Sequence, residues 1–157
     1  GAYGYHGLGD LAVFLFFGLI GVLGIQFLLG FPINHLAWSP AIFVGACSSA
    51  VLNANNLRDV ENDQQKGKNT LVVLMGYKVG RWYQTILIFS GLVSGFICLG
   101  PFNHWITYVA MVPLLVLGVI IIQTLREEEP RSMDRFLKRI ALSTFVFTLL
   151  LFIQHLI

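Results

Sequence analysis

The chain has 157 residues, of which 56% are apolar and only 11% are charged, and its mean hydropathy is +0.75. Soluble domains usually carry about 25% charged residues, so this chain has too few charges to cover a globular surface. The composition excludes an ordinary soluble domain, a disordered chain and a secreted disulfide scaffold. The net charge of +2 argues against a nucleic-acid partner. The length fits a single domain over residues 1–157.

The charged residues fall in three places. Asp10 stands alone, eight charged residues lie between Arg58 and Arg81, and nine lie between Arg126 and Arg139. A helix needs about 20 apolar residues to cross the hydrocarbon core of a membrane. The uncharged stretches are 11–57, 82–125 and 140–157. The first two are each long enough for two crossings, and the last is long enough for one.

Turn-forming residues divide each of the two longer stretches. Glycine and proline with polar neighbours occur over residues 30–35 and again over residues 100–104. We therefore predict an all-α, polytopic membrane helix bundle. Its five transmembrane helices are expected near residues 10–29, 39–60, 79–99, 105–125 and 138–156. Ser39, which precedes Pro40, is the expected N-cap of the second helix.

The distribution of basic residues predicts the orientation in the membrane. Five alternating helices place the loops 58–81 and 126–139 on one face, and these loops hold all ten Lys and Arg residues. The positive-inside rule assigns that face to the cytoplasm. The second of these loops is expected to be a solvated surface that meets anionic lipid head groups.

A polar cluster lies where the second predicted helix reaches the cytoplasmic surface. At about 100° per residue, Asn55, Asn56, Asp59 and Asp63 fall within about 100° of one another. Asp59 and Asp63 are neighbours on that face, and their like charges repel unless a cation lies between them. Magnesium prefers oxygen ligands and takes one or two carboxylates, completing its shell with water and phosphate. The pattern therefore predicts a Mg²⁺ site with Asp59 and Asp63 as ligands.

Basic residues follow this face directly. Lys66 and Lys68 flank a glycine, and two ammonium groups on a flexible turn suit a phosphate oxygen. The segment 55–76 is thus a candidate metal and diphosphate loop. An acidic pair at a helix end is often no more than a solvated face. The three amides within residues 53–56 favour a site, because amides are expensive to bury in lipid and a polar cavity would satisfy them.

The same segment carries a specific family pattern. Its residues are Asn55, Asn56, Leu57, Arg58, Asp59, Asp63, Gly67, Lys68, Asn69, Thr70, Leu71 and Gly76. This pattern resembles the second aspartate-rich motif of the UbiA superfamily of intramembrane prenyltransferases. The Asn-Asn-Leu-Arg and Gly-Lys-Asn-Thr elements, together with residues 3–10 and 16–18, are most similar to the branch that prenylates 1,4-dihydroxy-2-naphthoate in menaquinone synthesis.

The resemblance implies a fold and a missing partner. The family has nine helices, with a first aspartate-rich motif in its N-terminal half, and nothing in this chain matches that motif. The chain is similar to the C-terminal half, so the expected partner is the missing N-terminal half of the same protein. The fragment alone is expected to be inactive. The resemblance also places the protein in the bacterial inner membrane.

The resemblance implies transfer of a polyprenyl group from its diphosphate to the aromatic ring, with loss of the ring carboxylate to give demethylmenaquinone. Mg²⁺ would neutralise the leaving diphosphate. The expected catalytic residues are Asp59, Asp63 and Lys68, of which the two aspartates hold the metal and the lysine holds the diphosphate. Further contacts to substrate are expected from Asn55, Asn56, Lys66 and, as a weaker contact or a structural partner, Arg58.

Asp10 has two possible roles. It could be the N-cap or a first-turn acid of the first helix. Alternatively, Asp10 and Tyr5 could lie near the aromatic acceptor, because they share a membrane face with the metal motif.

Two other functions stay open at this stage. The chain could belong to a non-catalytic membrane protein, such as a transporter half or an assembly subunit, because intramembrane Asn and Asp also line solute paths. It could also belong to another UbiA-type enzyme with a different aromatic acceptor.

Overall fold

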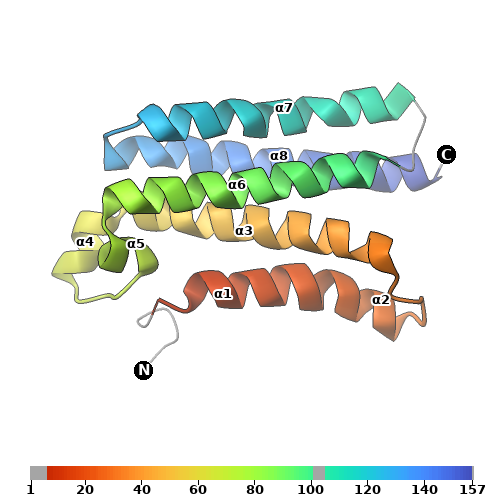
Figure 1. Ribbon diagram of the computed structural model, residues 1–157, viewed down its shortest axis with the longest axis horizontal. Helices are drawn as coiled ribbons and strands as arrows, with labels where there is room; N and C mark the ends of the chain where they lie inside the picture. The colour runs from red at the N-terminus through yellow and green to blue at the C-terminus, as the bar shows by residue number, and fades with distance from the viewer. Residues whose placement is uncertain (1–6, 101–104, 157) are drawn as a thin grey trace.

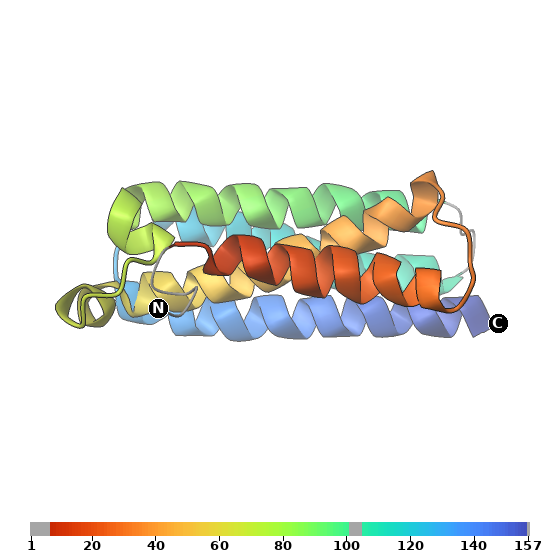
Figure 2. The same cartoon turned by 90° about the horizontal axis from the view of Figure 1, so that it is seen from below.

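The computed structural model describes residues 7–100 and 105–156, which form a bundle of long helices running side by side (Figures 1 and 2). Tyr5 lies outside these residues. Five segments are long and apolar enough to cross a membrane: Gly9–Leu28, His35–Arg58, Tyr77–Leu99, Trp105–Arg126 and Pro130–Gln154. They confirm the five predicted helices, and the chain is a multi-pass membrane protein of the all-α class.

Each span has its own substructure. The first consists of α1 (Gly9–Val13), the π-helix η2 (Phe14–Gly24) and α2 (Ile25–Leu28). The second consists of η3 (His35–Ala37) and α3 (Trp38–Arg58). Two short helices follow, α4 (Val60–Gln65) and α5 (Leu71–Met75). The remaining spans are α6 (Tyr77–Leu99), α7 (Trp105–Arg126) and η4 (Pro130–Ser132) with α8 (Met133–Leu156).

The second span begins earlier than the sequence predicts. Asn34, and not Ser39, is the capping residue, because its Oδ1 accepts hydrogen bonds from the backbone N–H groups of Leu36 (3.0 Å) and Ala37 (3.2 Å). The prediction that Ser39 caps the helix was therefore wrong. A short 3₁₀ turn inserts before α3, so Ser39 and Pro40 lie inside its first turn, where a missing backbone N–H is tolerated.

Two glycines bring the first span against α3. A Cβ built on Gly18 would lie 2.7 Å from both the Cα of Gly45 and the backbone oxygen of Ala41. Small residues allow this kind of backbone approach between membrane helices. The contact falls within η2, which has π-helical turns over eleven residues, whereas such turns usually occur singly. The hydropathy pattern predicted the span and gave no sign of its π-helical winding.

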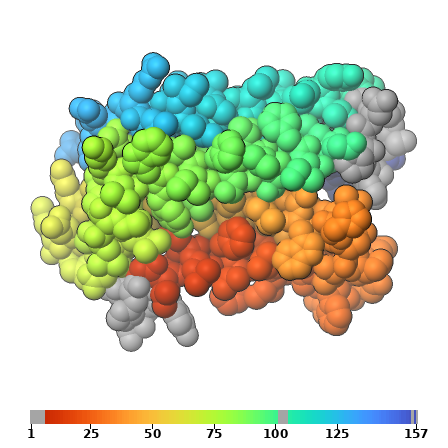
Figure 3. Space-filling view, viewed as in Figure 1, coloured from red at the N-terminus to blue at the C-terminus, as the bar shows by residue number. Residues whose placement is uncertain are grey.

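The centre of the bundle is α3. It packs against η2, α6 and α8, and α7 packs against α6 and α8. Within the apolar window of each span, 44% of the residues of His35–Arg58 are buried, compared with 11% for Gly9–Leu28. The first span therefore lies at the edge of the bundle (Figure 3). Because α3 is central, its successive side chains meet different neighbours.

A buried pair of amides joins α3 to α6. Asn53 Nδ2 donates hydrogen bonds to Oε1 of Gln84 (2.7 Å) and to the backbone oxygen of Gly80 (3.2 Å). Gln84 Nε2 donates in return to the backbone oxygen of Ala50 (2.9 Å). Both amide side chains are fully buried. The Asn53 Nδ2 group thus finds its partners inside the bundle, whereas its Oδ1 is buried without a hydrogen-bond partner.

The two charged loops meet at one end of the bundle. The segment with α4 and α5 and the connection from α7 to α8 lie together there, beside the start of α1 (Figure 1). Arg81 on α6 reaches the end of α7, where its Nη1 donates to the backbone oxygens of Leu125 (3.3 Å) and Glu127. The predicted placement of both loops at a common end is therefore confirmed.

Candidate functional site

Arg58, the last residue of α3, organises the charged end. Its Nε donates to Asp59 Oδ1 (2.8 Å) and its Nη2 to Asp59 Oδ2 (2.7 Å), which is the paired geometry that guanidinium and carboxylate groups favour. Nη2 also donates to Asn55 Oδ1 (2.7 Å), and Nη1 donates to Asp134 Oδ1 (3.0 Å) on α8. Arg58 is therefore a structural partner of Asn55, Asp59 and Asp134, while its predicted contact to substrate stays a prediction.

The charges around Asp59 keep it ionised. The hydrogen bonds from Arg58 hold the pKa of Asp59 below its ordinary value, and the positive charges of Arg58, Lys68 and Lys66 act in the same direction. Partial burial opposes these effects without reversing them. The Asp59 carboxylate is therefore negative at neutral pH, as a metal ligand must be.

Asp63 pairs with a different cation. Its side chain is 3% exposed, and its Oδ1 accepts a hydrogen bond from Lys68 Nζ (2.7 Å). The pairing follows from the end of α4. Gly67 has a φ of +68°, its N–H donates to the Gln64 oxygen (3.2 Å), and the N–H of Lys68 donates to the Asp63 oxygen (2.9 Å). This arrangement is a Schellman motif, in which the glycine reverses the chain and places Lys68 over Asp63.

The sequence held a signal for this pairing that its analysis missed. A glycine just after a short polar helix predicts a left-handed C′ residue, and such a turn brings the next residue back beside the helix. Lys66 is exposed at the C-cap of α4 and acts on Asp59 through its charge. The two lysines, for which the sequence already predicted different roles, therefore also differ in position and in partner.

A polar cavity of about 500 Å³ opens beside Asp59. Its lining comes from both loops: Arg58, Asp59, Glu61, Asn62, Glu129, Pro130 and Arg131. The second loop, which was expected to be a solvated surface, also contributes Glu129, Pro130 and Arg131 to this cavity. The turn between α7 and α8 packs next to the end of α3, where Asp134 accepts a hydrogen bond from Arg58 and an ion pair from Lys138 Nζ (2.6 Å). Only the helix packing brings that turn to the motif.

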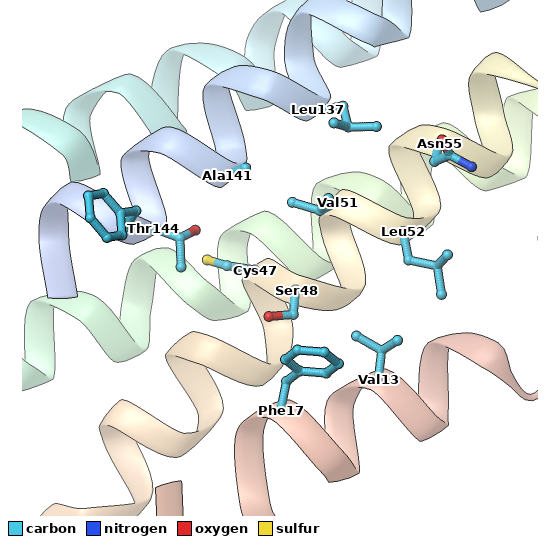
Figure 4. Close-up of a pocket in the computed structure, with 11 residues that line it drawn as sticks. Val13, Phe17, Cys47, Ser48, Val51, Leu52, Asn55, Leu137, Ala141 and Thr144 are labelled. Carbon is cyan, nitrogen blue, oxygen red and sulfur yellow. The ribbon is translucent and has the colours of Figure 1, made fainter. Parts of the chain in front are cut away.

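An apolar groove of about 640 Å³ leads to the same end of the molecule. It lies between η2, α3 and α8, with walls that include Phe17, Val51 and Leu137 (Figure 4). Along α3 the lining extends from Cys47 to Asn55, which is about 12 Å at the usual helical rise. Asn55 is the last α3 residue of the groove, and its Oδ1 is bonded to Arg58. Groove and charged network therefore meet at Asn55.

Asn56 faces elsewhere. It lines a small pocket of about 90 Å³ with Asp10 and Thr70, and does not line the groove or the polar cavity. Asp10 lies in the first turn of α1, whose N-cap is Leu8, so Asp10 is a first-turn acid and not the cap. Ser49 Oγ donates to the backbone oxygen of Asp10 (3.0 Å) and fixes α1 to α3.

The oxygen atoms of the charged end suit a hard cation. Within residues 7–100 and 105–156, no three His, Cys, Asp or Glu side chains gather as a metal site by themselves. Magnesium needs no such cluster, since one or two carboxylates with water and phosphate complete its shell. Asp59 and Asp63 are the two carboxylates that the sequence predicts as ligands, and each is paired with a cation of this chain. A metal that binds here must share or displace those cations.

Comparisons with known proteins identify the family of the chain. The family model of the UbiA prenyltransferase family matches residues 2–153. The chain is 37% identical to the 1,4-dihydroxy-2-naphthoate octaprenyltransferase of Escherichia coli over 98% of its own length and 51% of that protein. It is 52% identical to the Haemophilus influenzae protein of the same name over 55% of the chain and 28% of that protein.

More distant relatives include the chicken UbiA prenyltransferase domain-containing protein 1, which is 32% identical over 54% of the chain and 26% of that protein. No solved structure matches the chain significantly. Almost the whole chain aligns with the E. coli relative, and it spans about half of that protein's length.

Proposed function

Because the chain belongs to the UbiA prenyltransferase family, we propose that it forms part of an enzyme that transfers a polyprenyl group from polyprenyl diphosphate to 1,4-dihydroxy-2-naphthoate. The observation that carries this proposal is the junction at Asn55. A long apolar groove ends there, against Arg58, which is hydrogen-bonded to Asn55 and to the carboxylates of Asp59 and Asp134. An amphipathic ligand with an apolar tail and a polyanionic head fits that combination.

The groove would hold the isoprenoid chain. Its lining is almost entirely apolar and lies within the spans, so it excludes water from the carbon at which the diphosphate leaves. A carbocation-like centre survives only where water is kept away. The head of the same ligand would then lie at the charged end, beside Asn55 and Arg58.

Lys68 would hold the leaving diphosphate. Its side chain is 38% exposed, whereas that of its partner Asp63 is almost fully buried, so the lysine is the more accessible member of this ion pair. Charge-assisted contacts from an ammonium group to phosphate oxygens stabilise the negative charge that develops as the diphosphate departs. Lys66, which is exposed in the same turn, would add a second positive charge.

Asp59 and Asp63 would hold a Mg²⁺ ion. Both offer carboxylate oxygens, and the low pKa of Asp59 keeps that ligand charged. The bound metal would act as a Lewis acid on the diphosphate. Sharing Asp63 with the metal would require Lys68, which the Gly67 turn places on that carboxylate, to move toward phosphate.

The remaining parts of the proposal rest on the resemblance to the family described above. The missing half would bring the first aspartate-rich motif and complete the cation site, and the product would be demethylmenaquinone after loss of the ring carboxylate. The bacterial relatives favour the inner membrane as the location. The ten basic residues of the two clustered loops favour a cytoplasmic face for the site.

The test is prenyl transfer in detergent with labelled polyprenyl diphosphate, Mg²⁺ and 1,4-dihydroxy-2-naphthoate. The chain is assayed alone and joined to an N-terminal half that carries the first motif. We expect activity in the joined form alone, a loss of at least about 100-fold in Asp59→Ala and Asp63→Ala, and no loss in the exposed control Glu128→Ala.

Two results would contradict the proposal. Absence of turnover and of Mg²⁺-dependent diphosphate binding in both forms would contradict an enzymatic function. It would favour a transporter half or an assembly subunit. Turnover with another aromatic acceptor, and none with the naphthoate, would keep the enzyme class and change the substrate.

A further inference from the structure

A basic pocket lies between α6 and α7, apart from the proposed substrate site. Its volume is about 230 Å³, and its lining residues are Lys78, Arg81, Trp82 and Leu125. None of the four lines the apolar groove, the polar cavity beside Asp59 or the small pocket at Asp10. The basic pocket lies at the charged end of the bundle, where α6 begins and α7 ends (Figure 1). The proposed function gives it no role.

The two cations of this pocket are not neutralised by acids. Lys78 and Arg81 are three residues apart on α6, which places them on one face of the helix. Within the described residues, neither takes part in an ion pair. Glu127 contacts Arg81 through its backbone oxygen, and its carboxylate pairs instead with Arg135. The pocket therefore presents two positive charges and no negative side chain.

Arg81 is held in place by α7 and by its own helix. Its Nη1 donates to the backbone oxygens of Leu125 (3.3 Å) and Glu127, and its Cζ lies 5.3 Å from the centre of the Tyr77 ring. In the part of the chain that the structure describes, no hydrogen bond occupies Nη2. The guanidinium group is thus fixed and keeps donors for an anion, with the exposed Lys78 beside it in the pocket lining.

Exposed apolar side chains lead away from the pocket along both helices. They recur every three or four residues, so each set lies on one face of its helix, and each side chain is between 43% and 63% exposed. On α6 they are Trp82, Ile86, Phe89 and Val93, and on α7 they are Ile122, Val119, Leu115 and Val112. Both stripes start at the pocket, because Trp82 lines it and Ile122 lies one turn from Leu125. The charged pocket is therefore continuous with surface that suits acyl chains.

We propose that this pocket binds the phosphate of an anionic phospholipid, whose acyl chains lie along the two stripes. Guanidinium and ammonium groups suit phosphate oxygens, and basic pockets between membrane helices bind anionic head groups. A tryptophan such as Trp82 favours the same depth, at the edge of the membrane. A zwitterionic head group fits less well, because it brings its own cation next to Lys78 and Arg81.

The inference goes beyond the proposed function and does not rest on it. The loop 126–139, which was expected to meet anionic lipid as a solvated surface, contributes no lining residue to the pocket. The site is instead a defined one, formed by the start of α6 and the end of α7.

The experiment measures which lipid lies next to Trp82. The chain has three tryptophans, so Trp38→Phe/Trp105→Phe leaves Trp82 as the only indole. This protein is placed in phosphatidylcholine nanodiscs that contain a minor share of brominated phosphatidylglycerol or, in a parallel sample, the same share of brominated phosphatidylcholine. Bromine quenches only indoles close to it. We expect stronger quenching by the phosphatidylglycerol, with a preference of about 10- to 30-fold for the anionic lipid.

Charge-removing variants locate the preference. Lys78→Gln and Arg81→Gln should each lower it about fivefold. Arg81→Gln also removes hydrogen bonds to α7, so Lys78→Gln, at an exposed residue, decides the matter if Arg81→Gln does not fold. The matched control is Arg126→Gln, which removes an exposed cation at the same end that does not line the pocket. It should leave the preference unchanged.

Several results would overturn the proposal without touching prenyl transfer. Equal quenching by the two brominated lipids would do so, as would an unchanged preference in Lys78→Gln. An equal loss in Arg126→Gln would show diffuse attraction to the basic end and no defined pocket. Loss of the preference in inorganic phosphate, at matched ionic strength, would assign the pocket to a soluble anion.

The last arm repeats the measurement in the form joined to the N-terminal half, again with Trp82 as the only tryptophan. We expect the same preference there. Its loss would show that the missing half covers the pocket, and the lipid site would be overturned for the whole protein.

Discussion

Two polar clusters on α3 differ in ways that separate architecture from function. The Asn53 amide is fully buried, with its Nδ2 hydrogen-bonded to Gln84 and Gly80 of α6 and its Oδ1 without a partner, so this cluster is closed to solvent. The network of Asn55, Arg58 and Asp59 begins half a turn further along and opens onto a polar cavity, with the Arg58 side chain 30% exposed. The closed cluster holds two helices together, whereas the open one keeps charged groups within reach of a ligand.

The difference shows how polar residues at the end of a membrane helix are to be interpreted. Residue type and depth were nearly the same for all three asparagines in residues 53–56. Their neighbours differ because each residue rotates about 100° around the helix axis. Asn53 faces α6, Asn55 faces the groove and Arg58, and Asn56 faces the Asp10 pocket. Only the last two therefore qualify as candidate substrate contacts.

The largest expected effect is on diphosphate binding by Lys68, and it tests whether Lys68 binds a ligand or, like Asn53, only stabilises the fold. Lys68→Met leaves the buried Asp63 carboxylate without its cation, so we expect lower stability together with weaker binding of inorganic diphosphate and Mg²⁺. In Lys68→Met/Asp63→Asn the buried charge is gone and stability should recover. Diphosphate affinity should stay about 10- to 100-fold low, as the loss of a charge-assisted contact implies. Isothermal titration calorimetry and thermal unfolding measure the two properties.

The control for this change is Lys78→Met, which removes another exposed lysine at the same end of the bundle. Normal diphosphate affinity in the double variant would contradict the proposed role of Lys68, provided that Lys78→Met also binds normally. Lys68 would then belong with Asn53 among the architectural residues.

An intermediate effect is expected at the closed cluster. Asn53→Leu leaves Oε1 of Gln84 without its donor in a buried place, so the free energy of unfolding should fall by about 1–2 kcal/mol. Asn53→Leu/Gln84→Leu removes both polar partners and should lose less than the sum of the single changes. Reversible unfolding in mixed micelles measures these differences.

The matched change at the open cluster is Asn55→Leu. It should affect stability less than Asn53→Leu does and reduce prenyl transfer more. If the two leucine variants lost equal stability and equal activity, the distinction between the closed and the open cluster would fail.

The smallest expected effect is a change in the pKa of Asp59. Arg58→Gln removes the group that chiefly lowers the pKa of Asp59, so this pKa should rise toward its ordinary value near 3.8. A lowered pKa means that the unchanged protein gains stability from Asp59 above that ordinary value and loses it as the pH falls through the folded value. The variant should lose that acid-sensitive contribution. Carboxyl ¹³C NMR titration measures the pKa.

The appropriate control is Arg131→Gln, because Arg131 lines the same cavity as Asp59. We expect it to shift the Asp59 titration less than Arg58→Gln does. An unchanged titration in Arg58→Gln would show that the pairing with Arg58 does not set the charge state of Asp59.

Much of the fold could be predicted from the sequence because hydropathy is a local property. Five spans, their turns and the common end of the charged loops all follow from where the charges stop and restart along the chain. The helix start at Asn34 was missed because an N-terminal 3₁₀ turn leaves little trace in hydropathy, and Ser39 with Pro40 gave a stronger local signal. The π-helical winding of η2 left no trace in that pattern either.

The candidate site could be predicted only as a set of residue types. Asp59, Asp63 and Lys68 stand out by spacing, and their oxygens and charge suit Mg²⁺ and diphosphate. Their pairing could not be predicted from the helical face alone, because α3 ends at Arg58 and α4 begins at Val60. Because of that break between the helices, Asp59 pairs with Arg58 and Asp63 pairs with Lys68.

By itself, the sequence determined that this is a membrane helix bundle with one charged end and a family motif at that end. Which polar groups contact one another depends on the tertiary structure. Arg58 and Asp134 are 76 residues apart, yet they share a hydrogen bond, and Asp10 reaches the pocket of Asn56 and Thr70 only because Ser49 holds α1 against α3. The physical reason is that burial in lipid acts on each segment separately, whereas hydrogen bonds across the bundle depend on how the segments pack.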